Sequence, residues 1–279
     1  MTGTELEQGR AFAFIHLNER PPKPRSRGVT EIRGPYYAPV GQHYLEDLLE
    51  TMGAWVDTLK YAGGSFCLMP RESVRALNDL CHDHDVEVST GGFLEHVLTQ
   101  RGDAVDRYLE ECRELGFDLV EISSGFVTLP LDDLVGLTRT VREAGLKPKP
   151  EVGIQFGAGG ASTVEALEAE GTRDVGYAIE LAKRHLDAGA HMIMIESEGI
   201  TEQVREWRTD VVARIASEVG LEHVMFEAAD PDVFTWYVKN YGIDVNLFVD
   251  HSQIVQLECL RAGIWGTHDT WGRIHAYRH

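Results

Sequence analysis

The sequence is short of cysteine, and its four cysteines have no paired spacing. Cys67, Cys81, Cys112 and Cys259 are scattered through 279 residues, and no two form a Cys-x-x-Cys arrangement. Disulfide-stapled domains are dense in cysteine, and zinc sites typically carry closely spaced cysteine pairs. The sequence therefore argues against both kinds of site and favours a reducing compartment, so we expect a cytoplasmic protein.

Long apolar runs are missing as well. No stretch approaches the roughly 18 uncharged apolar residues of a membrane-spanning helix. The first residues, MTGTELEQGRAFAF, carry acids early and lack the apolar segment of a signal peptide. We therefore expect neither a membrane span nor a signal peptide.

Positive charge is scarce in this chain. It has 26 Lys and Arg against 45 Asp and Glu, a formal net charge of −19, and only six of the cations are lysines. Binding to nucleic acid or to an anionic membrane depends on Lys and Arg that neutralise phosphates. The composition therefore predicts no nucleic-acid and no membrane partner, although a local basic pocket for a small anion is compatible with it.

A β-then-α pattern repeats eight times after a Pro- and Arg-rich N-terminal arm, which we assign to residues 1–27. The expected strands are Val29–Arg33, Trp55–Tyr61, Val86–Thr90, Asp118–Ser123, Lys149–Gly153, His191–Glu196, His223–Glu227 and Val245–Asp250. The expected helices are 42–52, 71–84, 103–115, 131–144, 173–188, 202–219, 231–241 and 252–262. The pattern predicts a single (β/α)₈ TIM barrel domain over residues 28–279, with a doubly wound open sheet as the alternative.

One ionic or hydroxyl residue recurs near the end of every expected strand, and most intervals between these residues are close to 30. The eight residues are Glu31, Lys60, Thr90, Glu121, Glu151, Glu196, Glu227 and Asp250. The carboxyl ends of barrel strands meet at one mouth, so the recurrence favours the barrel over the open sheet. The one long interval contains a Gly-rich insert, Ile154–Thr172, which is either a lid over the mouth or a mobile acidic flap.

Four glutamates end, or nearly end, apolar strands: Glu121, Glu151, Glu196 and Glu227. Buried carboxylates need a cation or hydrogen-bond donors, and oxygen ligands favour Mg²⁺ over Zn²⁺. We predict a Mg²⁺ site formed by Glu151, Glu196 and Glu227. The alternative is a ring of carboxylates paired with lysines and arginines.

Two lysines fall among these acids. Lys60 ends the second strand and is a candidate anion clamp or proton donor, while Lys149 shares a strand face with Glu151. We predict a catalytic set of Lys60, Glu121, Lys149 and Glu151. Residues suited to bind substrate or phosphate follow other strands: Arg33, Gly63, Gly64, Gly91, Gly92, Asn246, His251 and Gly266.

Ordered motifs over about residues 28–271 resemble the phosphosulfolactate synthase family. They are LKYAGGS, STGGFLE, LGFDLVEIS, PEVG, LDAGAHMIMIE, VMFEA, VNL and LECLRAGIWG. The resemblance implies a (β/α)₈ barrel that adds sulfite to phosphoenolpyruvate with Mg²⁺, in a route to coenzyme M. It carries functional positions onto Lys60, Glu121, Glu151, Glu196 and Glu227.

Other segments, TEIRGPYY, EVGIQFGAGG and IESEG among them, are closer to the branch that contains the plant heat-stress-associated 32 kDa protein. The chain also has Ile154 and Gln155 where the synthases have a lysine after the EVG motif. Three functions therefore remain open: the synthase reaction, a related reaction with another nucleophile or phosphorylated acid, and a non-enzymatic role in heat stress. We expect a small-molecule substrate and a homo-oligomer.

Overall fold

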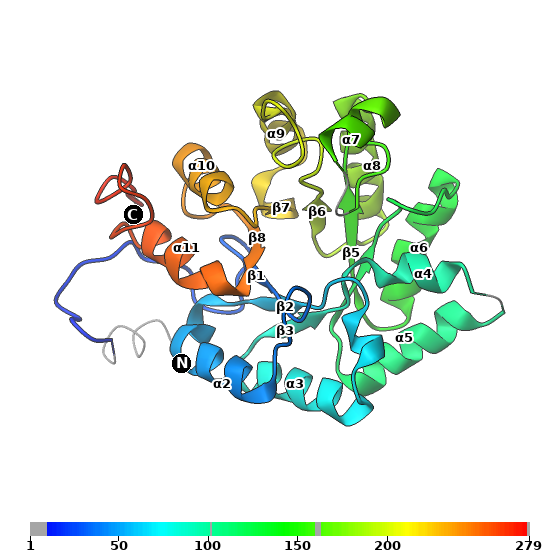
Figure 1. Cartoon of the computed structure of the whole chain (residues 1–279), viewed down its shortest axis with the longest axis horizontal. Helices are drawn as coiled ribbons and strands as arrows, with labels where there is room; N and C mark the ends of the chain where they lie inside the picture. The colour runs from blue at the N-terminus through cyan, green and yellow to red at the C-terminus, as the bar shows by residue number, and fades with distance from the viewer. Residues whose placement is uncertain (1–9, 101, 160–162, 278–279) are drawn as a thin grey trace.

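The computed structural model describes residues 10–100, 102–159 and 163–277, and it shows a closed barrel of parallel strands inside a layer of helices (Figure 1). The strands are β1 (Thr30–Arg33), β2 (Thr58–Lys60), β3 (Glu87–Ser89), β4 (Leu119–Ile122), β5 (Lys147–Val152), β6 (Ile193–Ile195), β7 (Val224–Glu227) and β8 (Leu247–Asp250). Strand β8 pairs with β1 and closes the sheet. This confirms the (β/α)₈ barrel and excludes the open sheet.

The helices alternate with the strands, as predicted. They are α2 (Gln42–Met52), α3 (Arg71–Asp83), α4 (Leu94–Leu98), α5 (Ala104–Leu115), α6 (Leu131–Glu143), α7 (Val164–Glu170), α8 (Val175–Asp187), α9 (Thr209–Glu218), α10 (Pro231–Tyr241) and α11 (Ile254–Arg261). Their ends follow local chemistry, since the Asp230 side chain caps α10 with Pro231 at its first position.

Several predicted boundaries were wrong, and three of them have a clear physical reason. The strand expected from Trp55 begins only at Thr58, because Gly53–Trp55 forms a 3₁₀ helix. The helix expected over 202–219 begins only at Thr209, because Glu202 is held in a turn: its carboxylate accepts from the Ser197 hydroxyl and its carbonyl from the Gly199 amide. Strand β5 begins at Lys147, two residues earlier than expected, because Lys147 and Pro148 pair with β4.

The apolar interior has two parts because strand side chains alternate between the two faces of the sheet. Outward-facing residues such as Ile32, Val120 and Val249 join the large core between sheet and helices. Inside the barrel lies a smaller cluster, formed by Val29, Met192, Met194, Met225 and Phe248. This inner cluster fills the lower part of the barrel, beneath the charged side chains at the carboxyl ends of the strands.

The N-terminal arm lies across the amino ends of the strands, which we call the floor of the barrel. Arg25 Nη1 donates to Asp57 Oδ1 at 2.9 Å, and Asp57 Oδ2 accepts from the Thr30 amide at 2.8 Å. Arg20 forms an ion pair with Glu258 of α11. The assignment of residues 1–27 as a segment distinct from the barrel stays a prediction, but the described part of the arm is anchored to the floor. No helix in the described part of the chain has the length and apolar composition needed to cross a bilayer.

Candidate active site

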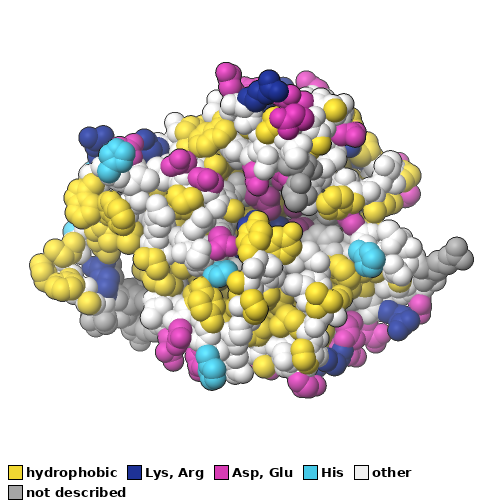
Figure 2. Space-filling view, in the orientation of Figure 1, with side chains coloured by type: hydrophobic (Ala, Val, Ile, Leu, Met, Phe, Trp, Pro, Cys, Tyr) yellow, Lys and Arg dark blue, Asp and Glu magenta, His cyan; other side chains and the backbone are white. Residues whose placement is uncertain are grey.

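Lys60 lies at the centre of the mouth, surrounded by carboxylates from three strands. Its Nζ is 2.8 Å from Glu121 Oε2 on β4, 3.3 Å from Glu227 Oε1 on β7 and 3.8 Å from Glu151 Oε2 on β5. It also lies 4.5 Å from the ring centroid of Phe248. The predicted convergence of these side chains on one cavity is therefore present, and Figure 2 shows acidic side chains around a hollow near the middle of this face.

Lys149 lies deeper and belongs to a second ion pair. Its Nζ donates to both carboxylate oxygens of Glu31, at 2.5 and 2.7 Å, and lies 3.4 Å from Glu121 Oε2. The Lys149 and Glu31 side chains are each 1% exposed. Glu31 thus takes up most of the hydrogen-bonding capacity of Lys149, which places this lysine under the mouth and leaves Lys60 facing it. The sequence pattern had flagged Glu31 at a strand end without suggesting this pairing.

The two lysines affect the pKa values of the neighbouring carboxyl groups unequally. Burial alone would raise the pKa of Glu121, but Lys60 and Lys149 outweigh burial and lower it. Burial, reinforced by repulsion from Glu121 and Glu227, raises the pKa of Glu151 well above its usual range despite Lys60. The mouth therefore holds more carboxylates than its own ammonium groups neutralise.

Excess negative charge continues toward β6. Burial and the neighbouring carboxylates of Glu227 and Glu151 raise the pKa of Glu196 well above its usual range. Glu196 Oε1 accepts from the Glu198 amide at 2.9 Å, and Ser197 Oγ lies 3.4 Å from Glu227 Oε2. Such carboxylate crowding is relieved either by protonation or by a bound cation.

The donor chemistry of this crowded side suits a hard divalent cation. Within residues 10–100, 102–159 and 163–277, no three His, Cys, Asp or Glu side chains are placed to enclose a metal ion by themselves. Mg²⁺, however, is usually held by one or two carboxylates and completes its shell with water and substrate oxygens. The predicted set of Glu151, Glu196 and Glu227 therefore does not form a three-carboxylate site in the described structure, and a Mg²⁺ held by one or two of these carboxylates stays a prediction.

Arg33 ends β1 at the same mouth. Its guanidinium carbon lies 5.0 Å from the Tyr37 ring centroid and 5.1 Å from that of Phe248. His251 Nδ1 lies 2.8 Å from the Arg33 carbonyl, which can only accept, so Nδ1 carries the proton of this bond. Predicted residues Arg33 and His251 are thus brought together where β1 and β8 end.

The predicted glycine pairs shape the next two loops. Gly64 and Gly91 have φ of +70° and +63°, and a Cβ on either would collide, with the Phe93 ring and the Tyr61 carbonyl respectively. A Cβ on Gly92 would lie 2.8 Å from Ser123 Oγ and 3.6 Å from Glu121 Oε1. Gly92 therefore borders Glu121. At positions 64 and 91 the positive φ of the backbone and the lack of room for a Cβ require glycine.

Sequence reasoning missed the role of Glu95, a buried carboxylate on α4. Its Oε1 accepts from the Ser123 hydroxyl at 2.5 Å and the Gly125 amide at 3.1 Å, and its Oε2 accepts from the Phe126 and Val127 amides at 2.7 and 3.0 Å. Glu95 thus holds the loop after β4 at the rim of the mouth. Only the motif STGGFLE pointed to it, without a role.

Two predicted substrate-binding residues lie elsewhere, and those predictions were wrong. Asn246 is fully buried at the floor, where its amide bonds the Val29 amide and the Val224 carbonyl across the amino ends of the strands. Gly266 follows α11 and packs against Leu260, with its carbonyl bonded by Gln256 on the same helix. Both predictions were based on the order of residues along the chain, which does not show whether a side chain reaches the mouth.

The insert after β5 is tied down at its base. Gln155 Nε2 donates to the carbonyls of Phe156, Leu167 and Gly171 at 3.1, 2.7 and 2.7 Å. A Cβ on Gly199, in the loop after β6, would collide with Gln155. Gln155, one of the two residues that stand where the resemblance predicts a lysine, is therefore a structural tie in this chain. Residues 160–162 lie outside the described part, so the lid hypothesis stays a prediction.

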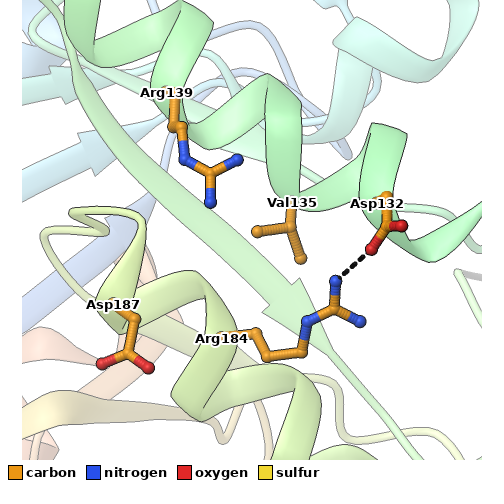
Figure 3. Close-up of a pocket in the computed structure, with 5 residues that line it drawn as sticks. All are labelled: Asp132, Val135, Arg139, Arg184 and Asp187. Atoms are coloured by element: carbon orange, nitrogen blue, oxygen red, sulfur yellow. Dashed lines mark hydrogen bonds and ion pairs between the residues drawn. The ribbon is translucent and has the colours of Figure 1, made fainter.

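A separate groove of about 270 Å³ lies on the outside of the barrel between α6 and α8 (Figure 3). Arg184 pairs there with Asp132 at 2.5 Å, and Arg139 points into the same groove. Asp187 balances the second arginine. The groove thus has no net charge and is remote from the strand ends.

Together, fold and site define a (β/α)₈ barrel protein with a charged pocket at the carboxyl ends of its strands, where barrel enzymes carry their active sites. A model of the family described as (2R)-phospho-3-sulfolactate synthase (ComA) matches residues 18–267. The chain belongs to this family, which confirms the resemblance seen in its motifs and supports an enzyme of the lyase type.

Individual relatives fall on both branches. The chain is 39% identical over 259 residues to HEAT-STRESS-ASSOCIATED 32 of Arabidopsis thaliana, covering 89% of this chain and 91% of that protein. It is 27% identical over 272 residues to the phosphosulfolactate synthase of Methanothermobacter thermautotrophicus, covering 95% and 99% of the two chains. The corresponding enzyme of Methanocaldococcus jannaschii is 25% identical over 272 residues, covering 95% and 100%.

Among solved structures, the carboxyl transferase domain of Rhizobium etli pyruvate carboxylase with pyruvate superimposes with a TM-score of 0.55 at 12% identity. The match covers 81% of this chain but only 40% of that one. At this identity the likeness supports the barrel fold alone.

Proposed function

We propose that this chain is a phosphosulfolactate synthase-like lyase that adds sulfite to phosphoenolpyruvate and forms a carbon–sulfur bond. The observation that carries the proposal is the position of Lys60, a buried cation at the mouth with carboxylates of β4, β5 and β7 around it. Family membership supplies the reaction class, and this geometry supplies the charged groups that such a reaction needs.

The chemistry creates negative charge and then consumes a proton. The sulfur lone pair of sulfite forms a bond to the methylene carbon of phosphoenolpyruvate, and the carbon–carbon π pair moves toward the substrate carboxylate. The adjacent carbon then takes up one proton, and the phosphate ester stays intact. A site for this reaction needs cationic groups near the substrate carboxylate and a proton donor beside the adjacent carbon.

Lys60 fits both needs better than Lys149 does. Burial alone would lower the pKa of Lys60, but Glu121, Glu227 and Glu151 raise it well above its usual value, so the ammonium form persists. In the proposed reaction Lys60 Nζ donates a hydrogen bond to the substrate carboxylate and delivers the proton to carbon. Lys149, held by both oxygens of Glu31, keeps Glu121 in place from below.

Glu151, Glu196 and Glu227 are the residues that would hold Mg²⁺. When bound, the ion supplies Lewis-acid stabilisation of the charge that develops on the substrate carboxylate. These carboxylates come from β5, β7 and the end of β6, and Arg33 comes from β1, so an anionic acid held through the ion would have its other end free to reach the guanidinium.

The direct test is to incubate the purified protein with phosphoenolpyruvate, sulfite and Mg²⁺ and to detect a sulfonated product by mass spectrometry. Lys60→Met is expected to lower kcat/KM by a factor on the order of 10³, since it removes both a proton donor and an electrostatic contact. Lys183→Met is the matched control, because Lys183 is exposed on the outer face of α8. Absence of product with the wild-type protein would refute the proposal.

A second candidate function is a non-enzymatic role in heat stress, which the 39% identity to the Arabidopsis protein favours. The two are separated by testing Lys60→Met and Glu151→Gln for thermotolerance in a host that depends on this protein. A non-enzymatic role predicts that both variants protect as the wild type does, whereas a catalytic role predicts that both fail.

A further inference from the structure

The mouth contains three inward-facing cations near the ends of the strands, and they differ in how many carboxylates they already contact. Lys60 lies within 4 Å of three carboxylates. Lys149 is bonded by both oxygens of Glu31 and also approaches Glu121. Lys60 Nζ is within hydrogen-bond distance of only two of its carboxylates, so one of its three donors remains for a single carboxylate oxygen, whereas a phosphate at either lysine would have to displace a buried carboxylate, which is costly.

Arg33 differs from both lysines. Its guanidinium stacks on Tyr37 and Phe248 and makes no ion pair with a carboxylate among the residues that the structure describes. Asp250, which pairs with Arg33 in the register of β1 and β8, attracts Arg33 from beyond ion-pair distance and uses Oδ1 for the Ser252 amide and hydroxyl at 3.0 and 2.6 Å. Arg33 is also only half-buried, so a ligand entering the mouth reaches it.

The surroundings of Arg33 fix its orientation. Two rings at about 5 Å restrain the guanidinium plane through cation–π contact. The His251 ring bonds the Arg33 carbonyl and packs against Tyr44 at 5.3 Å, so the backbone is held as well. A planar, restrained guanidinium presents paired N–H groups, which match two oxygens of a phosphate.

The other places that could bind an anion are either occupied by a carboxylate or carry no net charge. The backbone amides after β4, which form a natural anion-binding turn, already bind the Glu95 carboxylate. The groove between α6 and α8 matches its two arginines with two aspartates (Figure 3).

We infer that Arg33 is the phosphate-binding residue of this site, and that Tyr37 and Phe248 set its orientation. The inference rests on the proposed function for the identity of the ligand, a phosphorylated carboxylic acid. The phosphate then lies where β1 and β8 end, and the carboxylate of the same ligand points toward Lys60 and the acids of β5 to β7. The mouth thus has a phosphate end and a carboxylate end, and the reacting carbons lie between them.

The test compares the binding of phosphoenolpyruvate and of pyruvate, which lacks the phosphate, by isothermal titration calorimetry with Mg²⁺. We expect Arg33→Met to raise the Kd of phosphoenolpyruvate by about tenfold or more and to leave that of pyruvate unchanged. Arg33→Lys, which keeps the charge without the paired donors, should give an intermediate Kd. Arg139→Met, in the outer groove, is the matched control and should bind both ligands as the wild type does.

Several outcomes would overturn the inference. One is unchanged phosphoenolpyruvate affinity in Arg33→Met, and a second is an equal loss for both ligands, which would make Arg33 a carboxylate-binding residue. A third is a wild-type protein that does not bind phosphoenolpyruvate. If Arg33-dependent binding is found but no sulfonated product forms, the proposed reaction fails and the phosphate seat stands. If product forms although Arg33→Met binds phosphoenolpyruvate normally, the phosphate-binding role of Arg33 fails and the proposed reaction stands.

Discussion

Glu31 and Lys149 show how strongly one buried charge depends on another. Both side chains are almost fully excluded from water; without Lys149 the Glu31 carboxylate would lose its ion-pair partner, and without Glu31 the Lys149 ammonium would keep only the 3.4 Å contact with Glu121. Breaking such a pair costs far more than exchanging both members for apolar residues. Their pairing stabilises the interior beneath Lys60 and needs no direct contact with substrate.

We therefore predict that Lys149→Met or Glu31→Gln lowers the free energy of unfolding by about 3–5 kcal/mol. The double variant Glu31→Leu/Lys149→Met should lose much less than the sum of the two single effects. Urea denaturation followed by circular dichroism measures all three. Lys147→Met, two residues away on the same strand but partly exposed beside Glu87, should change stability by less than about 1 kcal/mol.

Gly91 provides a second test at the scale of one residue. Its φ of +63° and the nearby Tyr61 carbonyl leave no room for a Cβ, so Gly91→Ala combines backbone strain with a collision. We expect Gly91→Ala to lower the free energy of unfolding by more than about 2 kcal/mol. Gly145→Ala has the same kind of positive φ with open space around it, and should lose only about 1 kcal/mol. Equal losses of stability in the two variants would show that the atoms around position 91 move and relieve the collision.

At the scale of elements, helices α6 and α8 are joined by a buried polar contact. His185 Nδ1 lies 2.8 Å from Thr138 Oγ1, and burial, with a smaller effect of Arg184, lowers the pKa of His185 from 6.5 to about 4. The imidazole is thus neutral in the folded protein at pH values where it would be charged in the unfolded chain. The folded state binds fewer protons than the unfolded state between these two pKa values.

Stability should therefore fall as the pH drops from 6.5 toward 4, because protons favour the unfolded state over that window. A shift of this size corresponds to a loss on the order of 3 kcal/mol across the window. His185→Gln should flatten the dependence, which chemical denaturation at a series of pH values would show. If His185→Gln shows the same pH dependence of stability as the wild type, other groups cause the acid sensitivity.

The elements were predictable where apolar runs and end signals agree. Strands β6, β7 and β8 carry short apolar runs, and Asp230 with Pro231 marks the start of α10 as expected. The start of α9 was not predictable, because Glu202 suits a helix but is held by Ser197 in a turn that depends on tertiary contact. Helix α7 was missed because it lies within an insert whose glycines indicated a loop.

For the site, strand order predicted which acids gather at the mouth, and the structure places Lys60, Glu121, Glu151 and Glu227 together. Partners that come from distant strands were not predictable. Glu31 and Lys149 are 118 positions apart, and only the closed barrel brings them into contact. The prediction for Asn246 failed for another reason, because this residue precedes β8 at its amino end, whereas the mouth is formed by the carboxyl ends of the strands.

For the molecule as a whole, the arm is expected to unfold together with the barrel. Arg25 connects the arm to Asp57, which in turn holds the Thr30 amide at the start of β1. Arg25→Met should lower the free energy of unfolding by about 3 kcal/mol and keep a single transition by fluorescence and circular dichroism. Arg27→Ala, whose side chain is 57% exposed, is the control. A separate early transition for the arm would contradict this prediction.

The position of the described chain ends has a practical consequence. Asn18 of the arm bonds the carbonyls of Arg261 and Ile274, so the arm and the C-terminal segment meet beside the end of α11, at the left edge of the molecule in Figure 1. A surface tether or a fluorescent label placed on this edge would then leave the ligand entrance facing bulk solution. The protein is accordingly well suited to immobilised binding assays.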